Sequence, residues 1–176
     1  MTLRLRPATA ADIPAIAGIY REAVLNGAAS FETDPPSETE MARRRADLLA
    51  VGFPYLVAER AGVVSGYAYA GPYRQRAAYR STVEDSVYVA ADARGLGIGR
   101  ALLEGLLAAC EAIDCRLMVA VITDPGSEPS VALHAALGFT TVGTLSGVGH
   151  KHGRWLDTVL MQRRLGAGRA SPPTRG

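Results

Sequence analysis

The stretch Arg94-Gly95-Leu96-Gly97-Ile98-Gly99-Arg100 lies between a predicted strand and a strongly amphipathic segment. Glycine at every second position lets backbone N–H groups converge on an anion, and the start of a helix adds the positive end of its dipole. The stretch therefore predicts a pyrophosphate-binding loop, with a purely structural tight turn as the alternative. A P-loop is excluded because no Gly-Lys-Ser/Thr ends the stretch, and the dinucleotide fingerprint is excluded because positions 100 and 102 hold Arg and Leu.

The residues around this loop alternate between strand and helix patterns. Before it, residues 82–89 alternate in polarity, which predicts a strand with Glu84 on one face and Asp85, set aside as a site residue, on the other. After it, apolar side chains recur every three or four residues from Ile98 to Ile113, which predicts an amphipathic helix. The later elements are an apolar strand, a short helix closed by Gly138 and two last strands, expected at residues 117–122, 129–137, 140–145 and 155–163.

The N-terminal half predicts a strand, two helices and a hairpin. Residues 9–12 (TAAD) resemble a capping box, so a helix should follow them. A loop that carries the large hydrophobe Phe31 separates this helix from a second one opened by Ser37. Ala61-Gly62 should form the turn of the hairpin. The expected ranges are 3–6 for the first strand, 26–36 for the loop, 37–50 for the second helix, 55–60 and 63–70 for the hairpin, and 72–79 for a polar, arginine-bearing loop.

The composition is that of an ordinary globular protein, since 48% of the 176 residues are hydrophobic and 20% are charged. A disordered chain is excluded because it would be poor in apolar residues. No apolar run reaches the ~18–20 residues of a membrane span, and the first six residues carry no secretory signal. We therefore expect a cytoplasmic protein without a membrane partner. It should have one domain over residues 1–165 and a disordered basic tail over residues 166–176.

The charges and the cysteines exclude several other classes. The formal net charge of +2 is far from that of a nucleic-acid binder, so no nucleic acid is expected as a partner. Four arginines in the last fourteen residues leave RNA binding by the tail as an alternative. Cys110 and Cys115 lack a second pair, and no carboxylate–histidine cluster has metal-ligand spacing. We expect two reduced, structural cysteines and no metal.

Five separated segments, taken in order with the glycine-rich loop, resemble one protein family. An RGxGxG loop after a strand is similar to the coenzyme A pyrophosphate loop of the GNAT superfamily of N-acetyltransferases, and the order of elements matches that fold over residues 3–165. The closer resemblance is to the phosphinothricin (methionine sulfoximine) acetyltransferase subfamily. The segments that carry it are SFET at 30–33, AGPY at 70–73, TVEDSVYV at 82–89, PSVALHAALGF at 129–139 and KHGRW at 151–155. The resemblance implies a single α/β domain, with a mixed central β-sheet flanked by α-helices.

The resemblance also implies an activity, namely acetyl-CoA-dependent N-acetylation of a small amino acid-like amine by direct transfer in a ternary complex. It implies Glu84 as the general base and His134 as the acid that protonates the departing thiolate. A surface glutamate and an ordinary helix histidine are the alternatives. The backbone of residues 87–89 should pair with the pantetheine arm, with the Val89 N–H as oxyanion donor. The implied cofactor-binding residues are Val87, Tyr88, Val89, Arg94, Gly95, Leu96, Gly97, Ile98, Gly99, Arg100 and Ser127.

The same resemblance implies how the acceptor is held. A guanidinium group can bind a carboxylate or a phosphinate bidentately, so the basic residues before Glu84 should face the substrate's acidic group, with solvated loop charges as the alternative. Phe31 should cover the substrate's apolar body. The implied substrate-binding residues are Phe31, Tyr73, Arg74, Arg76 and Arg80. A homodimer is the family habit.

The sequence departs from the family pattern at two places. No Asn precedes the helix with His134, so Ser127 is the expected substitute, and His150 stands where the subfamily often has tyrosine. Two alternative functions stay open: a GNAT enzyme that acetylates another amine, such as a polyamine or a peptide N-terminus, and a non-catalytic coenzyme A-binding module. Glu84 beside an intact glycine loop argues against the second.

Overall fold

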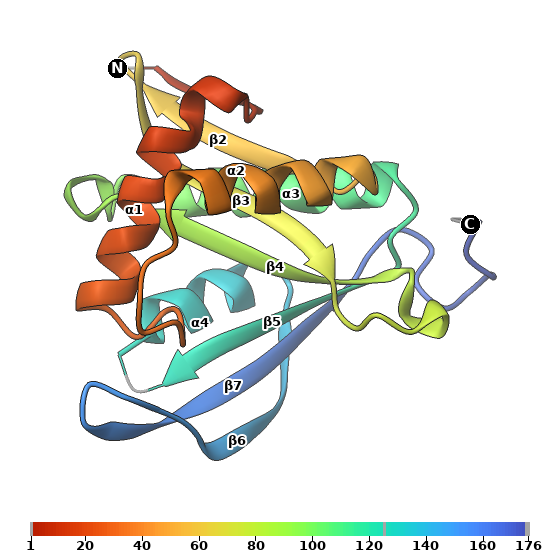
Figure 1. Ribbon diagram of the computed structural model, residues 1–176. Helices are drawn as coiled ribbons and strands as arrows, with labels where there is room; N and C mark the ends of the chain where they lie inside the picture. Colours follow the sequence, from red (N-terminus) through yellow and green to blue (C-terminus); the bar gives the residue numbers. More distant parts are fainter. Residues whose placement is uncertain (1, 125, 175–176) are drawn as a thin grey trace.

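Seven strands form one mixed sheet in the order β1-β2-β3-β4-β5-β7-β6, and every neighbouring pair except β4 and β5 is antiparallel (Figure 1). The computed structural model describes residues 2–124 and 126–174. The strands are β1 (Leu3–Pro7), β2 (Tyr55–Arg60), β3 (Val63–Pro72), β4 (Thr82–Val89), β5 (Leu117–Asp124), β6 (Thr140–Lys151) and β7 (Arg154–Arg164).

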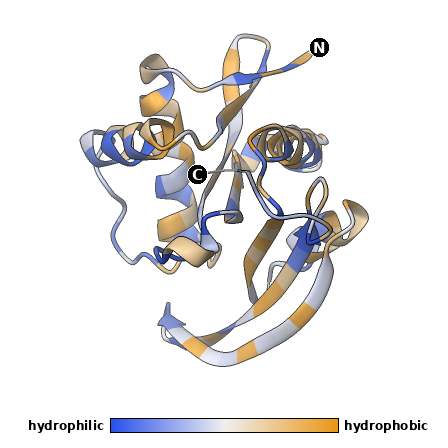
Figure 2. Cartoon of the chain, turned by 90° about the vertical axis from the view of Figure 1, so that its right-hand side faces the viewer, coloured by the Kyte–Doolittle hydropathy of each residue, from blue (hydrophilic) through white to orange (hydrophobic). Residues whose placement is uncertain are grey.

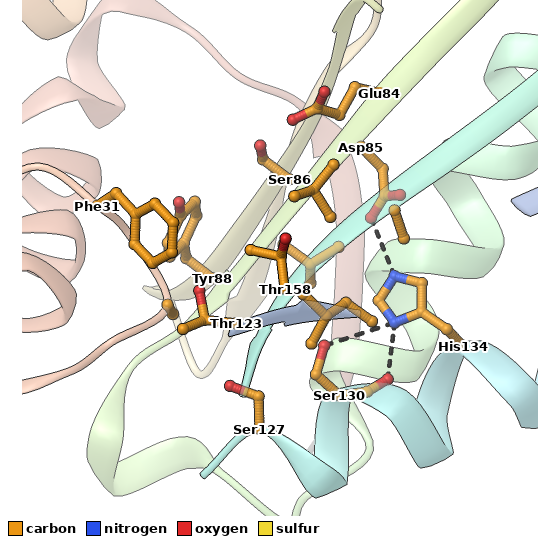
Figure 3. Close-up of a pocket in the computed structure, with 15 residues that line it drawn as sticks. Phe31, Glu84, Asp85, Ser86, Tyr88, Thr123, Ser127, Ser130, His134 and Thr158 are labelled. Atoms are coloured by element: carbon orange, nitrogen blue, oxygen red, sulfur yellow. Dashed lines mark hydrogen bonds and ion pairs between the residues drawn. The ribbon is translucent and has the colours of Figure 1, made fainter. Parts of the chain in front are cut away.

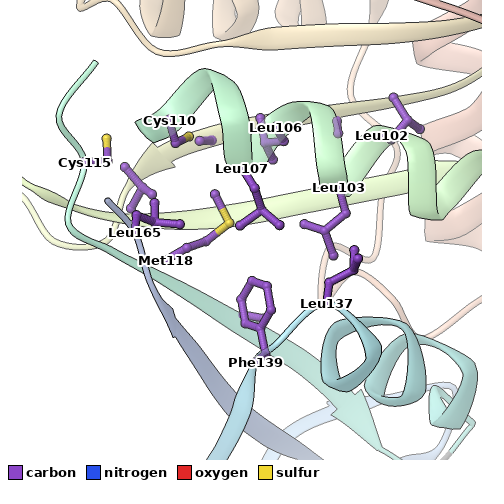
Figure 4. Packing of buried hydrophobic residues seen from close by; sticks show 14 of the residues in the cluster. Leu102, Leu103, Leu106, Leu107, Cys110, Cys115, Met118, Leu137, Phe139 and Leu165 are labelled. Carbon is purple, nitrogen blue, oxygen red and sulfur yellow. The ribbon is translucent and has the colours of Figure 1, made fainter. Parts of the chain in front are cut away.

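Helices cover both faces of the sheet, as Figure 2 shows. The four α-helices are α1 (Ile13–Asn26), α2 (Glu38–Ala50), α3 (Ile98–Ala112) and α4 (Glu128–Ala136), and the short 3₁₀ turns are Ala10–Asp12, Ala77–Tyr79 and Ala91–Ala93. Helices α1 and α2 pack on one face, against a cluster that includes Tyr55 and Tyr67. Helix α3 packs on the other face, where its leucines meet Met118 and Phe139 (Figure 4). The expected α/β fold class, a mixed sheet flanked by helices, is confirmed.

Local sequence signals explain most element ends. Ser37 is the N-cap of α2, and its Oγ accepts a hydrogen bond from the Glu40 N–H (3.2 Å). The capping box at residues 9–12 is present, with the Thr9 N–H donating to Asp12 Oδ2 (2.7 Å). Gly138 follows α4 with φ +84°, the left-handed conformation expected after a helix end. The predicted boundaries of these elements therefore hold to within a residue or two.

The last hairpin is longer than predicted. Strands β6 and β7 meet at a two-residue turn in which His152 and Gly153 both have positive φ. The register of the pair shifts between Thr141 and Gly143 and between Leu145 and Gly149. These irregularities interrupt the alternation of side chains, which explains why the sequence pattern predicted only residues 140–145 for the first of the two strands.

Residues 166–174, expected to form a disordered tail, make hydrogen bonds with the segment between α3 and β5. The Arg116 guanidinium donates to Gly168 O (3.3 Å) and Pro172 O (3.1 Å), and Asp114 accepts from the N–H and the hydroxyl of Thr174 (2.5 and 2.7 Å). Composition alone could not reveal these partners, because the contacts use backbone groups of the tail as well as the Thr174 hydroxyl. Residues 175–176 lie outside the described residues.

Candidate active site

The sheet splits between β4 and β5, and this split forms a cavity. The two strands pair only where Thr82–Glu84 face Leu117–Val119, and beyond this point they diverge (Figure 1). A cavity of about 290 Å³ lies in the opening (Figure 3). It is lined by Ala29, Phe31, Glu84, Asp85, Ser86, Val87, Tyr88, Ala120, Val121, Ile122, Thr123, Ser127, Ser130, His134 and Thr158.

The register between β3 and β4 decides which backbone groups face this cavity. The Ala90 N–H donates to Ser65 O (2.9 Å) and the Tyr73 N–H donates to Thr82 O (3.2 Å), which fits the antiparallel pairing of the two strands. Successive residues of a strand direct their backbone groups to opposite edges. The N–H groups of Val87 and Val89 therefore point toward β5, where the opening leaves room for a ligand to pair with them.

The glycine-rich loop lies between the 3₁₀ turn after β4 and the start of α3. Gly95 and Gly97 have φ of +76° and +79°, and Gly97 is the N-cap of α3. Among the described residues, apart from the two chain neighbours of each glycine, no atom lies within 4 Å of the position that a Cβ on either glycine would occupy. The loop thus combines left-handed glycines, open space and a helix N-terminus, which suits a bound pyrophosphate.

Glu84 stands where β4 and β5 cease to pair, half-buried and on the cavity wall. Burial raises the pKa of its carboxyl, the neighbouring Asp85 raises it further, and the charge of Arg74 lowers it. A carboxylate with a raised pKa is a stronger base than one in water. Glu84 is therefore suited to accept a proton from an amine in the cavity.

Asp85, which sequence reasoning set aside, forms a buried pair with His134. His134 is 3% exposed, and its Nε2 lies 3.0 Å from Asp85 Oδ2. Its Nδ1 lies 2.7 Å from Ser130 O, so Nδ1 carries the proton and donates it to this carbonyl. Burial alone would lower the pKa of His134, but the hydrogen bond to Asp85, the charge of that residue and the Ser130 carbonyl together raise it. His134 is thus held in a state that favours its protonated form.

Of the predicted acceptor residues, only Phe31 lines the cavity. Arg74 lies on the exposed segment after β3, stacks over the Tyr73 ring at 4.4 Å, and is close enough to lower the pKa of Glu84. Arg76 and Arg80 are exposed and lie outside the cavity lining, at the two ends of the 3₁₀ turn Ala77–Tyr79. The structure therefore brings Arg74 toward the site and leaves the other two arginines on the loop surface.

The predicted cofactor-binding residues also divide into some that line the cavity and others that lie outside it. Val87, Tyr88 and Ser127 line the cavity, whereas Val89 and the loop residues 94–100 lie beyond it, along the path from β4 to the start of α3. Ile98 is buried in the core, so only its backbone can serve a ligand. Thr123, Ser130 and Thr158 line the cavity and were not predicted. A polar residue within an apolar strand, such as Thr123 in β5, is the sequence signal that could have indicated them.

A split sheet with a basic carboxylate at its mouth and an anion-binding loop beside it is the arrangement of a GNAT N-acetyltransferase. The chain belongs to the acetyltransferase (GNAT) family, whose sequence profile matches residues 21–139. GNAT enzymes use acetyl-CoA as cosubstrate. Within the described residues no helix is long and apolar enough to cross a membrane, and no group of three or more His, Cys, Asp or Glu side chains could hold a metal ion.

The chain is similar to several members of this family along nearly its whole length. It is 55% identical over 162 residues to a phosphinothricin N-acetyltransferase of Alcaligenes faecalis, covering 92% of this chain and 82% of the relative. It is 42% identical over 176 residues to an L-methionine sulfoximine/L-methionine sulfone acetyltransferase of Pseudomonas aeruginosa, covering 98% and 100%. A crystal structure of a phosphinothricin acetyltransferase from Sinorhizobium meliloti in complex with AcCoA superposes with a TM-score of 0.95, at 54% identity and covering 100% of this chain and 95% of that one.

Proposed function

We propose that this enzyme acetylates the amino group of a small amino acid-like substrate of the phosphinothricin or methionine sulfoximine type. The acetyl group would come from acetyl-CoA, by direct transfer in a ternary complex. The observation that carries the proposal is the position of Glu84, a half-buried base at the mouth of the opening between β4 and β5. The names of the similar proteins from Alcaligenes faecalis and Pseudomonas aeruginosa support the substrate class.

The chain offers a fitting place for acetyl-CoA. The N–H groups of Val87 and Val89 face the opening and would pair with an extended pantetheine arm as with an added strand. The open space over Gly95 and Gly97 would admit the pyrophosphate to the N-terminus of α3. Ser127, which lines the cavity at the N-cap of α4, would contact the arm from the other side. Acetyl-CoA supplies the acetyl group as a thioester.

The chain's own residues then perform the proton transfers. Glu84 takes a proton from the substrate ammonium, directly or through water, so that the amine has a free electron pair. The Val89 N–H points into the opening and stabilises the oxyanion. Cys110 and Cys115 are buried in the core under α3 and are absent from the cavity lining, which supports transfer without an acylated cysteine.

His134 and Asp85 are the proposed source of the proton for the departing thiolate. Both ring nitrogens of His134 are engaged, so its Nε2 proton is shared with Asp85 at the edge of the cavity. The pair therefore stores one proton close to β4, where the thioester would lie. A protonated histidine is the acid form, so the acid step should fail as the pH rises through the pKa of His134.

The variant Asp85→Asn tests this acid. Loss of the carboxylate should lower the pKa of His134, measured by NMR titration, because the charge that raises it is gone and the neutral amide oxygen of Asn is a weaker acceptor. The alkaline fall of kcat should move to lower pH, and kcat at pH 8 should drop at least about tenfold, part of the ~10²–10⁴ that acid–base catalysis contributes. A lowered pKa of His134 with an unchanged pH profile would show that the pair is only structural.

A thiol-release screen with acetyl-CoA tests the substrate class. Methionine sulfoximine and phosphinothricin should be acetylated, and amines without an acidic group, such as polyamines, should be poor substrates. Arg74→Ala should raise the KM of the acidic acceptors about tenfold, the loss of ~1.4 kcal/mol of binding, while the KM of acetyl-CoA stays within about twofold. Arg76→Ala is the matched control, because Arg76 is equally exposed on the same loop. Efficient acetylation of a polyamine or a peptide N-terminus, with neither amino acid analogue turned over, would contradict the proposal.

We also propose a cytoplasmic homodimer. Four large apolar side chains of the β6–β7 hairpin are exposed, and a second copy of the chain would cover them. They are Val142, Leu145, Val148 and Trp155. Sedimentation of the protein should give twice the mass of one chain, and a monomer would refute the proposal.

A further inference from the structure

The KHGRW segment at residues 151–155 has no part in the proposed chemistry, yet its first residue is a buried lysine. Lys151 ends β6 and is 4% exposed. Its Nζ donates to Gly27 O (3.0 Å) and Ser30 O (2.7 Å), in the loop that joins α1 to α2. A buried ammonium group is unfavourable unless it is hydrogen-bonded, so these two carbonyls fix the position of the Lys151 side chain. The same two hydrogen bonds fix the loop backbone.

The same loop is anchored from the opposite side, on either side of Phe31. The Tyr20 hydroxyl lies 2.8 Å from Ser30 Oγ and donates to Glu32 Oε1 (3.0 Å). The Arg44 guanidinium donates to the same Glu32 oxygen at 2.6 Å. Ser30 and Glu32 are therefore fixed by α1 and α2, while Lys151 fixes the loop to the β6–β7 hairpin. This arrangement leaves Phe31 between two anchored neighbours.

Phe31 itself lies on the cavity wall (Figure 3), and its ring is close to Gly149 of β6. Its ring is seated on Gly149, where an added Cβ would come within 2.7 Å of the ring carbon Cε2. Phe31 as a residue is still 42% exposed, so packing against Gly149 does not bury it. Two residues at the end of β6 therefore contact the Phe31 loop. Gly149 packs against the Phe31 ring, and the Lys151 ammonium group binds the loop backbone.

We propose that Lys151 is a positioning residue that holds Phe31 over the part of the cavity where the acceptor amine would bind. Fixing the loop before the substrate arrives avoids the entropy cost of ordering it on binding. The ring is then ready to cover the apolar body of an amino acid-like acceptor beside Glu84. This inference rests on the proposed function for its effect on the acceptor, while the loop anchoring stands on the contacts alone.

Limited digestion with chymotrypsin tests the anchoring without any use of activity. The bond after Phe31 should be cut at least about tenfold faster in Lys151→Met than in the parent chain, because local opening governs cleavage of a native loop. Methionine keeps an unbranched side chain of similar size and removes only the charge and its hydrogen bonds. Equal cleavage rates in the folded variant would overturn the inference, whatever the enzyme acetylates.

A double-mutant cycle tests the effect on the acceptor. Lys151→Met and Phe31→Ala should each raise the KM of the acceptor about tenfold and leave the KM of acetyl-CoA within about twofold. The double variant should be no worse than Phe31→Ala alone, because the lysine acts through the ring. Multiplied effects would show that Lys151 acts on the acceptor independently of Phe31, and would overturn the inference.

Gly149→Ala provides a second variant, which leaves Lys151 intact. Its Cβ would collide with the Phe31 ring, and the backbone at residue 149 is outside the left-handed region, so no conformational strain is added. The KM of the acceptor should rise in the parent background and stay unchanged in the Phe31→Ala background. A rise of equal size in both backgrounds would show that the position of Phe31 is not what the hairpin controls.

Discussion

Glu84→Gln is expected to lower turnover by ~10²–10⁴-fold, the scale of general acid–base catalysis, and to leave the affinity for coenzyme A nearly unchanged. Glutamine has the same shape but cannot take a proton from the acceptor ammonium. The groups proposed to hold acetyl-CoA are backbone N–H groups of β4 and of the glycine loop, which the substitution does not touch. Turnover measured by thiol release and affinity measured by calorimetry separate the two effects.

The pH dependence provides a second signature of this base. In the parent enzyme kcat/KM should fall as the pH drops through the raised pKa of Glu84, and the Gln variant should lack this limb. Glu22→Gln, an exposed change on α1, is the control and should match the parent. Turnover of Glu84→Gln within a few-fold of the parent at neutral pH would remove Glu84 from the mechanism.

The same raised pKa makes a prediction about stability. A carboxyl whose pKa is higher in the folded state favours folding while it is protonated, and this contribution is lost as the pH rises through the folded-state pKa. At neutral pH ionised Glu84 therefore costs stability, and Glu84→Gln should melt no lower than the parent, with any gain vanishing below about pH 4, the ordinary range of a glutamate pKa. A half-buried charge that costs stability is tolerated at an active site because the chemistry needs it.

Local patterns were enough to predict most of the fold, because most elements are amphipathic in their own sequence and β5 begins as a continuous apolar run. Strand β4 has the predicted bounds, since its alternation runs unbroken from Thr82 to Val89. Strand β6 was predicted too short because two register irregularities break the alternation that marks a strand. The contacts of Asp114 and Arg116 with the tail were not predicted, because a composition rich in Gly and Pro carries no sign of such partners.

The site was less predictable because it depends on pairs that are distant in the sequence. Asp85 shares a strand face with three valines, and a carboxylate on an apolar face needs a buried partner. That signal was present in the sequence. The partner of Asp85, His134, lies 49 residues away, and only the fold reveals the pair. Lys151 and Ser30 are 121 residues apart and meet for the same reason. By contrast, the glycine loop is local, and its position at the start of α3 follows from the sequence alone.

Gly97→Val is expected to weaken the binding of coenzyme A about a hundredfold. The substitution places a β-branched side chain in the open space over the N-terminus of α3, where the pyrophosphate would approach the backbone. Hydrogen bonds to a charged group contribute ~1.5–3 kcal/mol each, so the loss of one or two of them accounts for this change. Calorimetry with coenzyme A measures it.

The control for this variant must carry the same backbone strain, because valine is disfavoured at any positive φ. Gly62→Val meets this need: Gly62 has φ +80°, against +79° for Gly97, and open space around it, but it lies in the β2–β3 turn. Both variants should lose similar stability in thermal melts, since the strain is the same. Only Gly97→Val should lose affinity for coenzyme A. If the folded Gly97→Val variant binds as well as Gly62→Val, the RGLGIGR loop is a structural turn, and the phosphate site must be sought elsewhere along the opening between β4 and β5.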